Sequence, residues 1–158
     1  MGDNKLRRLT LGNPNKYYYN PYWKNAINLS GCNYLQYFNL QNCITYNFEL
    51  DFTSCPIIET ILLTGSSPSS VKLPVNGMLT ELRLPTSIID LNIDSHKYLT
   101  NEGFSIGTYN YGEQEEIGAS GSHYVNDYGY LQNICIIDTP IDTYDMVSKA
   151  VSLESYYF

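Results

Sequence analysis

A short apolar frame recurs along the chain and constrains its fold more than any other feature. The frame reads apolar-x-x-apolar-x-apolar, and its last position falls at residues 11, 40, 63, 84, 106, 136 and 158. Most of these positions are about 22 residues apart, a spacing typical of chains that stack one repeat on the next. The frames are Leu6/Leu9/Leu11, Leu35/Phe38/Leu40, Ile58/Ile61/Leu63, Leu79/Leu82/Leu84, a degraded Phe104/Ile106, Leu131/Ile134/Ile136 and Leu153/Tyr156/Phe158.

A second apolar stripe lies about half-way between successive frames, with Leu29, Leu50, Val71 and Leu91 as examples. Each turn of chain therefore supplies two apolar edges that face each other across a thin core. A single turn cannot bury its own apolar face, so stability has to come from stacked neighbours. The pattern predicts a mainly parallel β-solenoid with about seven strand frames, spanning residues 1–158 as a single domain.

The frame and the residues after it resemble the leucine-rich repeat, whose signature continues into an Asn or Cys corner. The match is "LQYFNLQNC" at residues 35–43, with looser copies "INLSGC" at 27–32 and "LDFTSC" at 50–55. Such phrases are similar to repeats in structural proteins of tailed bacteriophages and in bacterial surface adhesins. The resemblance implies a leucine-rich-repeat solenoid with an irregular convex side, and a binding role rather than a particular ligand.

One convex segment is predicted to be helical. Asp142 suits an N-cap, and Asp145 occupies the third helical position in the manner of a capping box. We expect a short helix over residues 143–150.

Charge and hydropathy exclude two classes of partner. The net charge is −7 and the isoelectric point is near 4.6, which disfavours nucleic acid and anionic membrane surfaces. No stretch approaches the roughly 20 apolar residues of a spanning helix. We therefore expect neither nucleic-acid binding nor membrane insertion.

Residues that could carry chemistry are few. Cys32, Cys43 and Cys55 each follow an apolar stripe by three residues, where a corner side chain points inward. Cys32 and Cys55 occupy the same corner of adjacent turns, either as free thiols or as a disulfide, whereas Cys135 should point outward. Neither histidine lies in a nucleophile motif, and no paired metal-ligand spacing or phosphate loop occurs. We expect no enzyme, cofactor or metal site.

Two kinds of surface are candidates for binding. On the strand face, the outward residues expected to contact a partner are Tyr37, Leu62, Arg83 and Tyr157. The alternative interpretation is a solvated sheet face that contacts no partner. Two insertions, 13–25 and 107–129, exceed what the repeat needs, and long loops are usually functional or disordered. Their aromatic residues are Tyr17, Tyr18, Tyr19, Tyr22, Trp23, Tyr109, Tyr111, Tyr124 and Tyr128.

The first insertion either packs over the first turn as a cap or presents an exposed aromatic surface to a partner. The second has the Tyr, Ser and Gly content of adaptable recognition loops, and equally that of a loose excursion. No polar cap precedes the first frame or follows the last, which predicts a fragment of a larger protein or a chain packed against an assembly.

These features together predict a non-enzymatic binding or assembly module. The leading expectation is a phage virion component, structural or facing a host receptor, located in the virion. Its partners would be other virion subunits or a host surface receptor. The alternative is a bacterial cell-surface leucine-rich-repeat adhesin that binds host protein or glycan.

Overall fold

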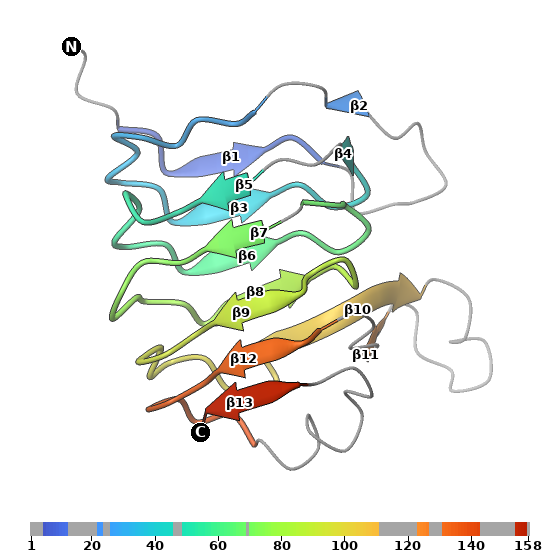
Figure 1. The fold of residues 1–158 in the computed structure, drawn as a ribbon. Helices are drawn as coiled ribbons and strands as arrows, with labels where there is room; N and C mark the ends of the chain where they lie inside the picture. The colour runs from blue at the N-terminus through green and yellow to red at the C-terminus, as the bar shows by residue number, and fades with distance from the viewer. Residues whose placement is uncertain are drawn as a thin grey trace.

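The computed structural model describes residues 5–12, 22–23, 26–45, 49–68, 70–110, 123–126, 131–142 and 154–157. These residues form a mainly parallel β structure in which the chain alternates between two rows of short strands (Figure 1). No helix occurs among them, and the helix predicted over 143–150 lies outside the described residues. Within the ranges given above, no helix has the length and apolarity that crossing a membrane requires.

The first row is a six-stranded sheet, called here the first sheet. Its order is β1-β3-β6-β8-β10-β11, parallel throughout except that β11 runs antiparallel to β10. The strands are β1 (Arg8–Thr10), β3 (Tyr37–Asn39), β6 (Thr60–Leu62), β8 (Glu81–Leu84), β10 (Phe104–Asn110) and β11 (His123–Asn126). The central residues of the first five frames fall in register across this sheet, as predicted: Leu9, Phe38, Ile61, Leu82 and Phe104.

The second row, called here the second side, lies nearer the viewer in Figure 1. It comprises a pair, β5-β7, and a three-stranded sheet, β9-β12-β13, all parallel within themselves. The strands are β5 (Glu49–Asp51), β7 (Ser70–Lys72), β9 (Asp90–Asn92), β12 (Asn133–Cys135) and β13 (Ser155–Tyr157). A further short pair joins β2 (Tyr22–Trp23) to β4 (Ile44–Thr45).

This second side corrects two sequence-based predictions. The convex side was expected to be irregular, yet it carries regular strands. The last two frames were expected to continue the first sheet, yet Ile134 pairs with Leu91, and Tyr156 with Ile134, on the second side. The positions of β12 and β13 therefore differ from the predicted ones by half a turn. Since both rows bury the same kind of apolar residue, periodicity alone does not distinguish them.

The core is the thin layer between the two rows. Inward side chains from both rows are fully buried, including Phe38, Leu50 and Phe52, and the Phe38 and Phe52 rings meet edge to face with centroids 5.1 Å apart. The three predicted corner cysteines, Cys32, Cys43 and Cys55, are buried in this layer, and none of them forms a disulfide. The arrangement is consistent with the expected solenoid.

Repeated turns carry the chain from the second side to the first sheet. The backbone N–H of Cys55 donates to the Phe52 carbonyl, and the N–H of Ile58 donates to the Cys55 carbonyl. Cys32 and His96 occupy the equivalent position in other turns, with matching bonds to the residues three before and three after them. Each corner thus satisfies its own backbone groups, which a buried turn requires.

Candidate functional site

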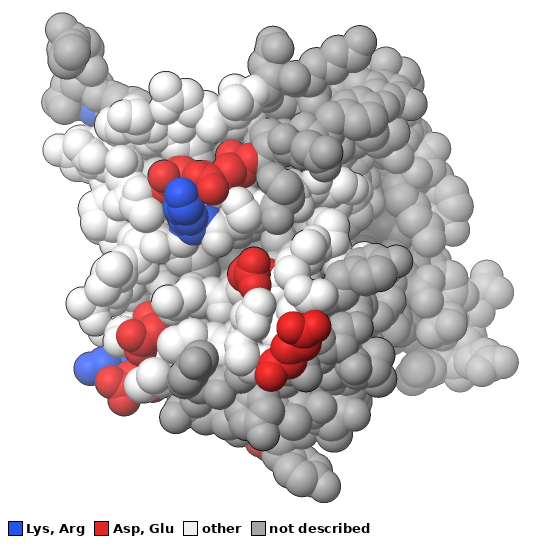
Figure 2. Space-filling model, viewed as in Figure 1, with Lys and Arg blue, Asp and Glu red and all other residues white. Residues whose placement is uncertain are grey.

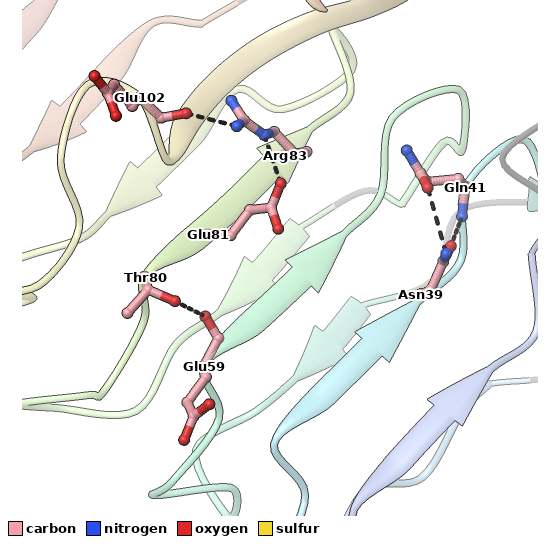
Figure 3. A network of polar contacts seen from close by, with 7 residues as sticks. All are labelled: Asn39, Gln41, Glu59, Thr80, Glu81, Arg83 and Glu102. Atoms are coloured by element: carbon pink, nitrogen blue, oxygen red, sulfur yellow. Dashed lines mark hydrogen bonds and ion pairs between the residues drawn. The ribbon is translucent and has the colours of Figure 1, made fainter. Parts of the chain in front are cut away.

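The outward face of the first sheet is largely occupied by its own contacts. Arg8 lies over the ring of Tyr37 with its guanidinium carbon 3.8 Å from the ring centroid, and the Asn39 amide donates to the Tyr37 hydroxyl at 3.2 Å. Asn39 also donates to Gln41 and accepts from its backbone N–H (Figure 3). Tyr37 was predicted as a contact residue, and here its ring and hydroxyl are both engaged within the chain.

The other predicted residues of this face are also held. Leu62 is only 8% exposed, so the prediction that it forms an open contact surface is wrong. Arg83 donates to Glu81 at 3.2 Å and to the Glu102 backbone carbonyl at 2.6 Å, as Figure 3 shows. Tyr157 lies in β13 on the second side, because its strand pairs with β12. The four residues therefore do not form one face.

The two insertions are described only in part. Tyr22 and Trp23 form β2, which pairs with Ile44 and Thr45 of the next turn, so part of the first insertion extends the stack. Tyr109 of β10 is directly opposite Tyr124 of β11 in an antiparallel pair. The remaining aromatic residues, Tyr17, Tyr18, Tyr19, Tyr111 and Tyr128, lie outside the described residues.

Two of the thiols, Cys43 and Cys55, are in environments that suppress nucleophilicity. Burial, reinforced by the nearby Cys32 and Asp51, raises the pKa of the Cys55 thiol to about 11, and burial also raises that of Cys43. Thiolate is the reactive form, so both are poor nucleophiles at neutral pH. Cys135 is partly exposed, as predicted for an outward residue of its strand.

His96 replaces cysteine at its corner and is 1% exposed. Desolvation lowers the pKa of the imidazole, although a hydrogen bond to the Pro74 carbonyl and the nearby Asp94 oppose this shift. Its Nδ1 is buried and has no hydrogen-bond partner among the residues that the structure describes. The ring fills space beside Gly77, where a Cβ would lie 2.4 Å from the His96 Cε1 atom. Those contacts indicate a packing role.

An apolar ridge follows the edge where the second side turns into the first sheet. Tyr34, Ile57 and Tyr98 each occupy the position two residues after the corner residue of their turn, and Met78 occupies the same position relative to Asn76 in the turn between those of Ile57 and Tyr98. Tyr34 is 44% exposed, Met78 42% and Tyr98 57%, and Ile57 is partly exposed. We call these four residues the edge ridge.

A groove crosses the second side where strand pairing is interrupted. No ladder joins β7 to β9, although β5 pairs with β7 and β9 with β12. Two adjoining hollows of about 410 and 280 Å³ occupy this break and share Val71, Lys72 and Asn92. We call them together the β7–β9 groove. The first also holds Glu49, Ser70, Asp90, Leu91, Asn133, Ile134, Cys135 and Ser155, and the second Thr53, Leu73, Pro74, Val75, Asp94 and His96.

The connections from the first sheet to the second side differ in length. The chain passes between Asn39 and Glu49, between Leu62 and Ser70, and between Leu84 and Asp90, and these connections shorten from one turn to the next. β5 and β7 nevertheless pair in register, so connection length alone does not account for the break between β7 and β9.

Acidic side chains predominate over basic ones on the second side (Figure 2). Lys72 is paired with Glu49 at 2.9 Å. The Lys72 hydrogen bond lowers the pKa of Glu49, and Glu49 in turn raises the pKa of Lys72. In the ranges that the structure describes, no group of three or more His, Cys, Asp or Glu side chains is placed to hold a metal ion.

Neither the edge ridge nor the groove was predicted, although the sequence contains the signal for each. Apolar residues directly precede the first position of four consecutive frames, as in Tyr34-Leu35 and Tyr98-Leu99. Alternation about the second apolar stripe points Asp90 and Asn92 outward on either side of Leu91. The interruption between β7 and β9 has no such local signal.

Comparison with known proteins adds no relative. No protein-family model matches the chain, and no curated protein or solved structure matches it either.

Proposed function

We propose that this chain is a non-enzymatic binding and assembly module with a leucine-rich-repeat type of β-solenoid fold. We propose further that it serves in a bacteriophage virion, as a structural component or as one that faces a host receptor. The fold proposal is supported by the in-register parallel strands of the first sheet and by the repeated corner turns. The virion proposal rests on the similarity of the repeat phrases to those of phage structural proteins.

The edge ridge is the observation that carries the binding proposal. Its four residues come from consecutive turns, so the backbone fixes them in a line along a rigid edge. Tyrosine and methionine are suited to protein interfaces, since tyrosine provides area with a polar tip and methionine adapts its shape. Exposed apolar groups in a continuous row indicate a contact surface more strongly than scattered ones do.

The surroundings of the candidate nucleophiles support a non-enzymatic role. A catalytic thiol requires a lowered pKa and access, whereas burial raises the pKa of Cys43 and of Cys55. The His96 imidazole is buried in a corner and contacts the turn next to it.

A second candidate function is a bacterial cell-surface adhesin that binds host protein or glycan. The β7–β9 groove favours it, because its volume falls in the range of small-molecule sites and its rim is polar. The two candidates place the chain in different locations, the phage virion and the bacterial cell surface.

Fractionation of the source culture separates these candidates. An antibody against the chain should detect it in gradient-purified phage particles if it is a virion component, and mass spectrometry of the same band should identify its peptides. Detection in the cell-wall fraction alone would favour the adhesin. A chain confined to the cytosol would contradict both.

Substitutions on the edge ridge test the contact surface itself. We expect the double variant Tyr34→Ser with Tyr98→Ser to keep its fold. It should no longer be retained in the fraction, phage particle or cell wall, in which the wild-type chain is detected. The matched control is Ile89→Ser, which replaces a residue 42% exposed that lies off the ridge. Equal retention of all three proteins would exclude the edge ridge as the contact surface.

A further inference from the structure

The β7–β9 groove has features of a ligand site that the edge ridge lacks. The groove is concave, and it joins an apolar floor to a polar rim. Val71, Leu91 and Ile134 form the floor, and each is buried to more than nine-tenths. We propose that this groove binds a neutral saccharide, an inference that rests on the proposed binding function and names its ligand class.

One rim of the groove carries a chain of oriented polar groups. The Ser155 hydroxyl donates to the side-chain Oδ1 of Asn133, and the side-chain Nδ2 of Asn133 donates to Asp90 Oδ1 at 2.5 Å. These bonds cross three adjacent strands, so the backbone register holds each group in place. Asp90 Oδ2 has no bond to the rest of the described chain and remains an acceptor for a sugar hydroxyl.

Asn92 supplies a donor beside that acceptor. Its Oδ1 accepts the backbone N–H of Asp94 at 3.0 Å, which fixes the orientation of the amide. The Nδ2 group bonds to none of the described residues, and the side chain lines both hollows. Asp90 and Asn92 are two residues apart on one strand and so point to the same side. A sugar hydroxyl both donates and accepts, and an adjacent carboxylate and amide match it.

The opposite rim indicates that the saccharide is neutral. Glu49 accepts the Ser70 hydroxyl at 3.1 Å and pairs with Lys72, so the cation that borders the groove already has a counter-ion. Asp90 and Asp94 add negative charge to the lining. A phosphate, sulfate or sialic acid would meet these carboxylates with no unmatched cation among the described lining residues, which is unfavourable. The apolar floor suits the C–H face of a sugar ring.

An array of neutral, sialylated and sulfated glycans tests the proposal. We expect the full chain to bind neutral glycans on the array. The double variant Asp90→Ala with Asn92→Ala should weaken that binding by about tenfold or more, because it removes both the acceptor and the donor for a sugar hydroxyl. The matched control is Asp51→Ala, an acidic residue of neighbouring β5 that lies outside the groove lining. Circular dichroism checks that each variant is folded.

A blank array overturns the proposal, as does retention of charged glycans alone or binding that the Asp90→Ala and Asn92→Ala changes leave unaltered. Loss of binding with Asp51→Ala to the same extent would also overturn it, since the effect would then come from general charge. The proposed function fails differently. If the edge-ridge variants lose retention while the array is blank, the chain is an assembly module whose groove does not take sugar.

Discussion

At the scale of single residues, the fit between Gly77 and His96 shows how one turn depends on the next. Gly77 leaves room that the His96 ring occupies, and a Cβ there would approach Cε1 to 2.4 Å and Nδ1 to 2.8 Å. We expect Gly77→Ala to lower the free energy of unfolding by about 1–3 kcal/mol, the usual cost of overpacking. Urea denaturation measures this loss.

The double variant is the control for this pair. His96→Ala removes the ring that the new methyl group would strike, so the two changes together should cost less than their sum. Additive losses would show that Gly77 is needed for its backbone rather than for the space it leaves.

The same histidine should make stability depend on pH. Burial lowers the pKa of His96 in the folded chain below its ordinary value of 6.5, so the unfolded chain binds the proton more readily. Stability from this group is therefore complete above about pH 6.5 and is lost as the pH falls through the folded-state pKa. Denaturation at about pH 7.5 and about pH 5 should show a larger loss for the wild type than for His96→Gln. An identical loss in both proteins would assign the acid sensitivity to other groups.

At the scale of the strand, burial differs between the middle and the end of the first sheet. Leu63 follows β6 and is fully buried, whereas Leu9 of β1 is only partly buried. We expect Leu63→Ala to lower the free energy of unfolding by about 2–5 kcal/mol, because it opens a cavity in a thin core. Leu9→Ala should cost clearly less. Equal losses would mean that the end strand is packed as tightly as the central ones.

The strands also show what the sequence could and could not predict. The frames around Phe38, Ile61 and Leu82 were placed correctly, since apolar spacing and strand alternation report which residues face the core. The frame around Ile134 was assigned to the wrong row, because both rows bury the same residue types and a long insertion breaks the count. Leu62 was expected to be exposed, but its side chain is buried. Strand alternation predicts which side of the sheet a residue faces, whereas its burial depends on what packs over that side.

The candidate sites were harder to predict for the same physical reason. Outward positions have no apolar period to mark them, so Tyr37 and Arg83 were chosen by residue type. Both make contacts within the chain. The β7–β9 groove lies where strand pairing is interrupted, and such an interruption becomes visible only when the turns are placed side by side.

At the scale of the whole molecule, the four cysteines report on how the stack opens. Cys32, Cys43 and Cys55 are buried in the core layer, whereas Cys135 is partly exposed on the second side. Thiol reagents react with accessible thiolate, and burial raises the pKa of Cys55 to about 11. We therefore expect one thiol, Cys135, to be alkylated rapidly in the native protein, and the other three only after opening of the stack.

Peptide mapping by mass spectrometry after timed alkylation identifies the modified residue, and Cys135→Ser should remove the rapid phase without altering the slow one. Added urea should accelerate the slow phase. If Cys32, Cys43 and Cys55 then react at one common rate, the turns open as a single cooperative unit. Separate rates would show that neighbouring turns open independently, which is the behaviour of a one-dimensional stack held by nearest-neighbour contacts. Rapid alkylation of Cys55 in the native chain would contradict the buried corner itself, because that thiol has no exposed surface in the folded structure.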